Sequence, residues 1–195
     1  MNKSDPQKKG KLFVITAPSG AGKTTMRNYL LENNPELYFS VSATTRQPRP
    51  EEVIHKDYHF MTQEEYNNHL NNNNFLEHAE VFGNYYGTLK QPILDRLEKG
   101  IDVLLDVDTK GARQVKQKIS DAILIFIEPP SMEELERRLR SRGTESEEVI
   151  CKRLREAEFE MAQRDFFDYR VVNDILENAR KEIERILYPC NLLND

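Results

Sequence analysis

Phe13-Val-Ile-Thr-Ala-Pro-Ser-Gly-Ala-Gly-Lys-Thr-Thr25 is the stretch of sequence that decides the fold. It begins within a short apolar run, Leu12–Thr16, which has the length and composition of a buried β-strand. A helical pattern over residues 24–33 follows the glycines directly. A strand, a glycine-rich turn and a helix that opens with Lys-Thr form the pattern of a phosphate-binding loop. The stretch therefore predicts an anion site where the strand meets the helix.

The chemistry of this loop suits the phosphate chain of a nucleotide. Gly20 and Gly22 permit backbone conformations that are closed to other residues, so successive N–H groups can point inward at a phosphate beside a helix N-terminus. Lys23 is expected to reach the β- and γ-phosphates, and the hydroxyl of Thr24 to bind Mg²⁺. The strict pattern begins with glycine, whereas Ala17 stands there. We expect the alanine to be tolerated if its φ is negative.

The rest of the chain alternates short apolar runs with helical stretches. Buried strands are predicted at residues 101–106, 122–128 and 169–173, and helices at 62–70, 92–99, 109–118 and 175–187. Gly100 is expected to stop the helix at 92–99. Thr62 and Ser131 each precede a glutamate by three residues and are expected to cap helices. Strands that are apolar on both faces and alternate with helices predict an α/β fold, with a parallel sheet covered by helices on both faces.

Residues 39–89 break this pattern. They are rich in Tyr, Arg, Pro and Asn, and residues 75–88 predict a hairpin that turns at 82–84. We interpret them as an inserted small α+β subdomain, and the charged residues 137–158 as a helical lid. The core of a single domain, residues 1–195, would then be residues 11–38 and 90–195.

Composition and charge exclude several classes of protein. The 195 residues carry a net charge of -5, so no overall positive field favours nucleic acid. No apolar run approaches the roughly 18 residues of a membrane helix, and the polar N-terminus lacks the apolar core of a secretory signal. Cys151 and Cys190 form no close motif, and we interpret them as thiols in a reducing compartment. We expect a cytoplasmic protein with neither nucleic acid nor membrane as a partner.

Two acidic residues narrow the chemistry, because a phosphate loop alone fits GTPases, motors and kinases. Asp106 ends the predicted strand at 101–106, where a carboxylate suits Mg²⁺ or its water ligands. Asp108 follows two residues later on the same face.

A second anion site is predicted by Arg46 and Arg49. Nearby prolines stiffen this segment, and two guanidiniums held close together form a phosphate clamp. The phenol hydroxyls of Tyr58 and Tyr86 could each add a hydrogen bond. The sequence thus contains a candidate phosphate donor site and a candidate acceptor site.

Several long motifs, in order, resemble the guanylate kinases, enzymes that phosphorylate GMP with ATP. The matching segments are APSGAGKTT, VSATTRQPRP, DYHF, FLEHAEVFGNYYGT, VLLDVDTKGARQVK, IEPPSMEELERRLRSRGTESEEVICKRL and VVND. They run from residue 12 to about residue 174, which is most of the chain. The family fold, a P-loop core with a GMP-binding subdomain and a mobile lid, agrees with the predicted organisation.

The resemblance implies transfer of the γ-phosphoryl group of Mg-ATP to GMP, and we expect dGMP to be accepted as well. The products would be ADP and GDP, within purine nucleotide metabolism and GMP recycling. The implied catalytic residues are Lys23, Arg46, Arg138, Arg142 and Arg153. ATP would be bound by Ala17, Pro18, Ser19, Gly20, Ala21, Gly22, Lys23, Thr24, Thr25 and Asn173. GMP would be bound by Ser42, Arg46, Arg49, Tyr58, Glu77, Tyr86, Thr88 and Asp108, and Mg²⁺ by Thr24 and, through water, Asp106.

The chemistry of guanine supports the implied role of Glu77. Guanine presents two donors on one edge, N1–H and the 2-amino group, and a carboxylate accepts both. Adenine lacks both donors, so AMP would leave the carboxylate desolvated and unpaired. No general base is needed, because a phosphate monoester with a second pKa of about 6 is mostly dianionic at pH 7. We therefore assign no role to His55, His59, His69 or His78.

The sequence also departs from the family pattern. Family members commonly have Gly at the position of Glu51 and Asn-Gly near His55, so the loop between Arg49 and Tyr58 is expected to take a different path. His78 occupies a position often held by Trp, which we interpret as a change in packing.

Three alternative functions remain open at this point. A related kinase could act on ribose 1,5-bisphosphate or another nucleoside monophosphate, although Glu77 favours guanine. Guanylate-kinase-like interaction modules bind phosphorylated partners, but they typically have a damaged phosphate loop. A GTPase would be expected to carry a guanine-reading Asn-Lys-x-Asp-type loop later in the chain than the phosphate loop, and the sequence after the phosphate loop contains no such run. The sequence leaves open whether the protein is a monomer or a homodimer.

Overall fold

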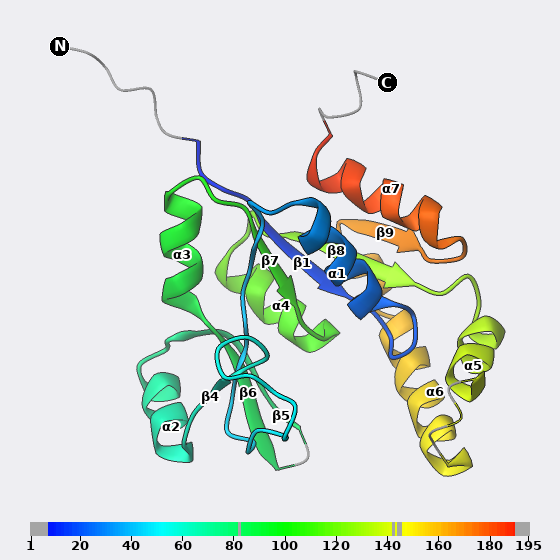
Figure 1. The fold of residues 1–195 in the computed structure, drawn as a ribbon, viewed down its shortest axis with the longest axis horizontal. Helices are drawn as coiled ribbons and strands as arrows, with labels where there is room; N and C mark the ends of the chain where they lie inside the picture. Colours follow the sequence, from blue (N-terminus) through cyan, green and yellow to red (C-terminus); the bar gives the residue numbers. More distant parts are fainter. Residues whose placement is uncertain (1–7, 82, 142, 144–145, 190–195) are drawn as a thin grey trace. The chain divides into compact units, whose positions relative to one another are not determined.

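The structure is a computed structural model that describes residues 8–81, 83–141, 143 and 146–189 (Figure 1). Backbone contacts group the chain into two compact units. The first unit comprises Met1–Leu12, Glu36–Leu105 and Lys110–Ala122, and the second comprises Phe13–Pro35, Asp106–Thr109 and Ile123–Asp195. The predicted subdomain at residues 39–89 lies within the first unit, and the predicted lid at residues 137–158 lies within the second.

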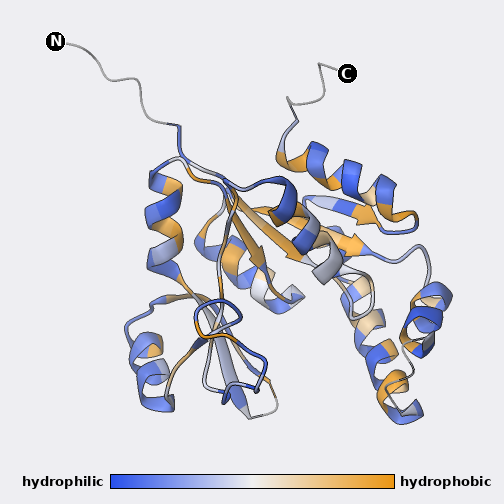
Figure 2. Ribbon diagram, in the orientation of Figure 1, coloured by the Kyte–Doolittle hydropathy of each residue, from blue (hydrophilic) through white to orange (hydrophobic). Residues whose placement is uncertain are grey.

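The second unit is built on parallel strands. Strand β8 (Ile123–Glu128) pairs in parallel with β1 (Leu12–Thr16) and with β9 (Tyr169–Val172). All five residues of β1 are buried, as expected of a parallel strand that is covered on both faces. Figure 2 shows β1 and β8 in the hydrophobic colour along most of their length. The carboxyl end of β1 leads directly into the phosphate loop.

Helices of the second unit present apolar stripes to its core. They are α1 (Lys23–Asn33), α5 (Met132–Ser141), α6 (Glu147–Met161) and α7 (Leu176–Leu187). A short 3₁₀ helix, η1 (Arg164–Phe166), follows α6. In α7 the buried residues are Ala179, Ile183 and Leu187, spaced by four so that they share one face. Helices α5 and α6 pack through a small cluster, Leu135, Leu139, Ile150 and Ala157.

The first unit contains a two-stranded parallel pair and a separate four-stranded sheet. Strand β2 (Tyr38–Phe39) pairs in parallel with β7 (Val103–Asp106). The four-stranded sheet has the order β4-β3-β6-β5, in which the strands are His59–Phe60, Ala43–Thr44, Asn84–Leu89 and Phe75–Val81. The helices of this unit are α2 (Gln63–Asn71), α3 (Lys90–Glu98) and α4 (Thr109–Lys118).

Helix α2 covers one face of the four-stranded sheet. Thr62 and Glu65 form the predicted capping box, in which each side chain accepts a hydrogen bond from the other residue's backbone N–H. Tyr66 is 1% exposed and packs in a cluster with Ala43 and Phe75. Since α2 packs on this face of the four-stranded sheet, side chains that point to the other face do not contact α2.

The predicted elements are all present, with ends that differ by at most two residues. The hairpin of β5 and β6 turns through Gly83, whose φ of 74° suits glycine. The predicted stop of α3 is confirmed at Gly100, which has a φ of 76°. The α/β fold class is confirmed. Within the part of the chain that the structure describes, no helix is long and apolar enough to span a membrane.

Candidate active site

The phosphate loop, residues 17–24, joins β1 to α1. Gly20 and Gly22 have φ values of 93° and 100°, in the left-handed region that the sequence predicted for this loop. A Cβ on Gly22 would press against Nδ2 of Asn173, so a side chain there would displace the Asn173 amide and would also be strained by the left-handed backbone. Ala17 is buried and has a negative φ, which explains how alanine is tolerated at the first position.

Lys23 and Asp106 form the central ion pair of the second unit. Nζ of Lys23 lies 2.5 Å from Oδ1 of Asp106 and 3.4 Å from the carbonyl oxygen of Val107. Arg27 approaches the other carboxylate oxygen, with Nη1 3.5 Å from Oδ2. The carboxylate at the end of β7 thus fixes the loop's lysine before any nucleotide binds.

Thr24 and Asp106 fit a magnesium ion by the chemistry of their oxygen atoms. Thr24 is the second residue of α1 and is exposed, and Asp106 lies beside Lys23. Across the described residues, no group of three or more His, Cys, Asp or Glu side chains is arranged so that it could hold a metal ion. Mg²⁺ is usually bound by one or two protein oxygens, with phosphate and water supplying the rest. A hydroxyl and a carboxylate therefore suit this ion better than a metal that needs a complete protein cage.

Asn173 links the phosphate loop to Arg138 on α5. Nδ2 of Asn173 donates to the backbone carbonyl of Ala21 at 2.7 Å. The backbone carbonyl of Asn173 accepts from Nη2 of Arg138 at 2.9 Å. Nε of Arg138 also donates to Glu134 at 2.8 Å. Arg137 and Arg138 together hold the pKa of Glu134 down at about 2. Arg138 is therefore oriented by two partners at the edge of the loop.

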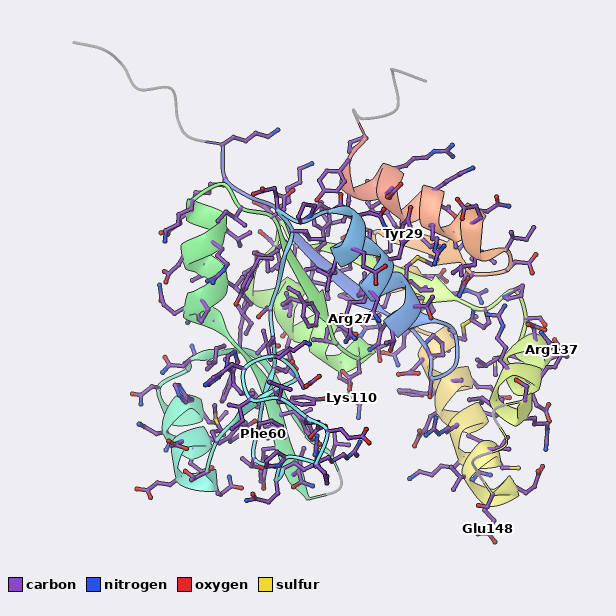
Figure 3. The ribbon with its side chains drawn as sticks, in the orientation of Figure 1. Arg27, Tyr29, Phe60, Lys110, Arg137 and Glu148 are labelled. Atoms are coloured by element: carbon purple, nitrogen blue, oxygen red, sulfur yellow. The ribbon has the colours of Figure 1, made fainter. Side chains whose placement is uncertain are left out.

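The other arginines predicted for the lid are placed differently from one another. Nη1 of Arg153 donates to the hydroxyl of Ser19 at 3.1 Å, which brings α6 to the phosphate loop. Arg142 lies outside the described residues. Arg137 and Arg140 form the predicted pairs with glutamates on a solvated helix face, and Arg137 points outward from α5 (Figure 3).

Glu160 on α6 is a residue of this site that sequence reasoning missed. Burial raises the pKa of its carboxyl to about 7, the positive charge of Lys23 opposes the rise, and Asp108 and Glu156 add to it. Asp108 therefore lies among the charged groups of the second unit. No sequence signal separates Glu160 from the neighbouring glutamates of the same charged helix.

The predicted arginine clamp of the first unit is organised by Glu52, which sequence reasoning also missed. Arg46 donates from Nη2 to Oε1 of Glu52 at 2.7 Å and from Nη1 to Oε2 at 3.0 Å. The backbone N–H of Arg49 donates to Oε2 at 2.8 Å. The bond to Glu52 is the main cause that raises the pKa of Arg46, and a hydrogen bond with Tyr86 also contributes.

Tyr58 and Tyr86 lie in the same cluster. Their rings meet edge to face with centroids 5.9 Å apart, and the guanidinium carbon of Arg46 lies 5.5 Å from the centroid of the Tyr58 ring. The structure therefore brings Arg46, Tyr58 and Tyr86 together, while the side chain of Arg49 is exposed.

Glu77 occupies a buried position on the face of the sheet opposite α2. It is 6% exposed and pairs across the strands with Thr88, whose hydroxyl donates to Oε1 at 2.5 Å. Strand β3 pairs Thr44 with Tyr86, and the same register continued places Ser42 opposite Thr88. Side chains of paired residues share a face, so Ser42, Thr88 and Glu77 line one surface together with Tyr86.

The loop before Tyr58 contains a residue with an unusual backbone conformation. His55 has a φ of 65°, a left-handed conformation that glycine adopts at lower cost. Its Nδ1 lies 2.8 Å from Nδ1 of His59, whose pKa is lowered by burial and then by His55. His78 packs near the ring of Phe75.

Comparisons with known proteins agree with this arrangement. A family model described as guanylate kinase matches residues 9–189. A guanylate kinase of Synechococcus sp. (strain JA-3-3Ab) is 50% identical over 184 residues, covering 94% of this chain and 85% of the relative. The guanylate kinase of Escherichia coli (strain K12) is 48% identical over 180 residues, covering 91% and 87%.

A solved structure supports the same assignment. The crystal structure of guanylate kinase from Anaplasma phagocytophilum superposes with a TM-score of 0.74 at 36% identity, over 94% of this chain and 87% of that chain. The family model, which matches nearly the whole chain, and the relatives, which are about 50% identical to it, indicate the same family. The chain belongs to the guanylate kinase family.

Proposed function

We propose that this protein transfers the γ-phosphoryl group of Mg-ATP to GMP, and to dGMP, giving ADP and GDP. The observation that carries the proposal is the buried carboxylate of Glu77, which accepts from Thr88 on a sheet face shared with Tyr86. A buried carboxylate is costly unless donors pair with it, and guanine supplies two adjacent donors. The chain belongs to the guanylate kinase family, and GMP carries the guanine base whose donors match this carboxylate.

ATP would be bound by the second unit. Residues 17–25 would surround its phosphates with backbone N–H groups, and Lys23 would exchange Asp106 for the β- and γ-phosphate oxygens. Thr24 and, through water, Asp106 would bind Mg²⁺, which when bound neutralises charge on the phosphates. Asn173 would contribute by holding the loop through Ala21 and by approaching adenine.

GMP would be bound by the first unit. Arg46, Arg49, Tyr58 and Tyr86 would hold its phosphate, because guanidiniums and phenols supply directed donors for a dianion. The hydroxyl of Ser42, or that of Thr88 in place of its bond to Glu77, would donate to guanine O6, and Glu77 would accept from N1–H and the 2-amino group. We also propose that Asp108 contributes to GMP binding, as the family resemblance implies.

Catalysis would consist of positioning and charge stabilisation. The lid arginines, Arg138, Arg142 and Arg153, would neutralise the transferring phosphoryl group and exclude water, which would otherwise accept it. Two of the three already contact the phosphate loop or the residue that braces it. The acceptor phosphate is dianionic at neutral pH, so no protein base is required.

We further propose that residues 39–89 act as the GMP-binding subdomain and residues 137–158 as the lid, with residues 11–38 and 90–195 as the core. The protein would act in the cytoplasm on small molecules, as a monomer or a homodimer.

The test is ADP formation from Mg-ATP with GMP, dGMP, AMP, CMP, UMP, dTMP and ribose 1,5-bisphosphate added separately. The proposal expects ADP with GMP and dGMP, and no more than background with the others. Turnover that depends on another acceptor, or that needs none, would overturn it.

A further inference from the structure

Helix α4 contacts the outer edge of strand β5, the last strand of the four-stranded sheet. Gln114 binds both backbone groups of one β5 residue: its Nε2 donates to the carbonyl of His78 at 3.0 Å, and its Oε1 accepts from the N–H of His78 at 3.1 Å. Its side-chain amide thus pairs with the strand edge as a neighbouring strand would.

Lys118, one turn further along α4, contacts the same edge. Its Nζ donates to the carbonyl of Phe75 at 2.8 Å. Residues four apart on a helix share a face, so Gln114 and Lys118 reach the strand together. Burial lowers the pKa of Lys118, as does the charge of Lys90, while the carboxylate of Glu77 acts in the opposite direction. The ammonium of Lys118 therefore lies near enough to Glu77 for the two charges to interact.

These two contacts flank Glu77. The pairing of β5 with β6 shifts register between Phe75 and Glu77, so the regular ladder is interrupted just before this residue. Lys118 binds the strand before the irregularity, and Gln114 binds it at His78, just after Glu77. A strand edge with an interrupted ladder would otherwise leave the carboxylate on a less constrained backbone.

We propose that Gln114 and Lys118 are positioning residues that fix β5 and so set the place of the Glu77 carboxylate for guanine. The inference rests on the proposed reading of guanine by Glu77. Recognition of two adjacent donors depends on carboxylate placement to within a fraction of an ångström. Side chains that touch no substrate would then control selectivity for the acceptor.

The test is a Gln114→Leu variant, which removes both hydrogen bonds at similar side-chain size. Gln117→Leu is the matched control, because Gln117 is exposed on the same helix. Two hydrogen bonds of ordinary net strength correspond to a rise of about tenfold in the KM for GMP. The KM for ATP should stay within about twofold of the wild-type value. The ratio of kcat/KM for GMP to kcat/KM for AMP should fall. Amide exchange at residues 75–79 should quicken in Gln114→Leu and not in Gln117→Leu.

The outcomes separate the inference from the proposed function. If the wild type uses GMP and Gln114→Leu keeps its KM for GMP and its selectivity, the inference is wrong. Equal rises in the KM for both substrates would also overturn it, since they indicate general damage. If Gln114→Leu fails to fold, the Lys118→Met variant takes its place. Because it loses one hydrogen bond, its KM for GMP should rise about threefold while its KM for ATP stays the same. An unchanged KM for GMP in Lys118→Met would reject the positioning role. A wild type without GMP-dependent turnover would instead refute the proposed function, whatever the exchange rates show.

Discussion

The carboxylate of Glu52 binds the guanidinium of Arg46 through two hydrogen bonds, of 2.7 Å to Nη2 and 3.0 Å to Nη1. The same carboxylate accepts from the backbone N–H of Arg49 at 2.8 Å. One acidic side chain thus connects both arginines of the proposed phosphate clamp. The clamp is preorganised in the protein itself, so less ordering remains when a phosphate arrives.

Replacement of Glu52 by alanine should weaken GMP use. Without the carboxylate, Arg46 loses its bidentate partner and the segment carrying Arg49 loses a hydrogen bond, so we expect the KM for GMP to rise about tenfold. Steady-state kinetics with GMP varied at saturating ATP measures this. Glu51→Ala, at the exposed neighbouring residue, is the control. A lower KM in Glu52→Ala would mean that the carboxylate competes with the phosphate.

Replacement of Glu77 by glutamine should reduce discrimination between bases. The amide supplies one acceptor where guanine offers two donors, and its NH₂ group meets a donor, so kcat/KM for GMP should fall at least about a hundredfold while that for AMP changes little. Glu80→Gln, at an exposed residue of the same strand, should behave as wild type. Unchanged selectivity in Glu77→Gln would place guanine recognition elsewhere.

The two neighbouring arginines of α5 should differ in their effect on turnover. Arg138 is held by Glu134 and by the carbonyl of Asn173, whereas the side chain of Arg137 is 71% exposed and pairs with Glu134. We expect Arg138→Ala to lower kcat about a hundredfold or more, through loss of charge stabilisation, and Arg137→Ala to lower it less than about twofold. Single-turnover measurements distinguish the chemical step from product release. Equal effects of the two variants would contradict the proposed role of Arg138.

The stability of the protein should depend on pH through Glu160. Its folded pKa of about 7 lies above the ordinary value of 4.5, mainly because of burial. The protonated carboxyl therefore makes its full contribution to the free energy of unfolding below about pH 4.5. This contribution is lost as the pH rises through about 7. Glu160→Gln removes this loss, so its Tm should exceed that of the wild type by roughly 2–6 °C at pH 8 and by little near pH 4.5.

Thermal unfolding of the wild type and Glu160→Gln at both pH values measures the effect. Glu158→Gln, at an exposed residue of the same helix, should show no such pH-dependent difference. A constant difference across the pH range would mean that Glu160 is not the group that titrates.

The sequence predicted the features that depend on local chemistry. The phosphate loop, the capping box at Thr62 and the stop at Gly100 are encoded by neighbouring residues, so spacing alone identifies them. Contacts across the chain could not be predicted this way: Arg138 with Asn173 and Gln114 with His78 join residues about 35 positions apart. Glu52 lies only six residues from Arg46, but in an irregular loop that has no repeating period to relate the two side chains.

The most direct test of the proposed reaction follows the γ-phosphoryl group of labelled ATP in the presence of GMP. The wild-type protein should place the label in the β-phosphate of GDP, one label for each ADP formed. Lys23→Ala should lower this transfer at least about a thousandfold through loss of charge stabilisation, with an unchanged fold by circular dichroism. Lys181→Ala, at an exposed lysine of α7, should transfer label as the wild type does. Label released as inorganic phosphate, or a Lys23→Ala variant that transfers at the wild-type rate, would contradict the proposed function.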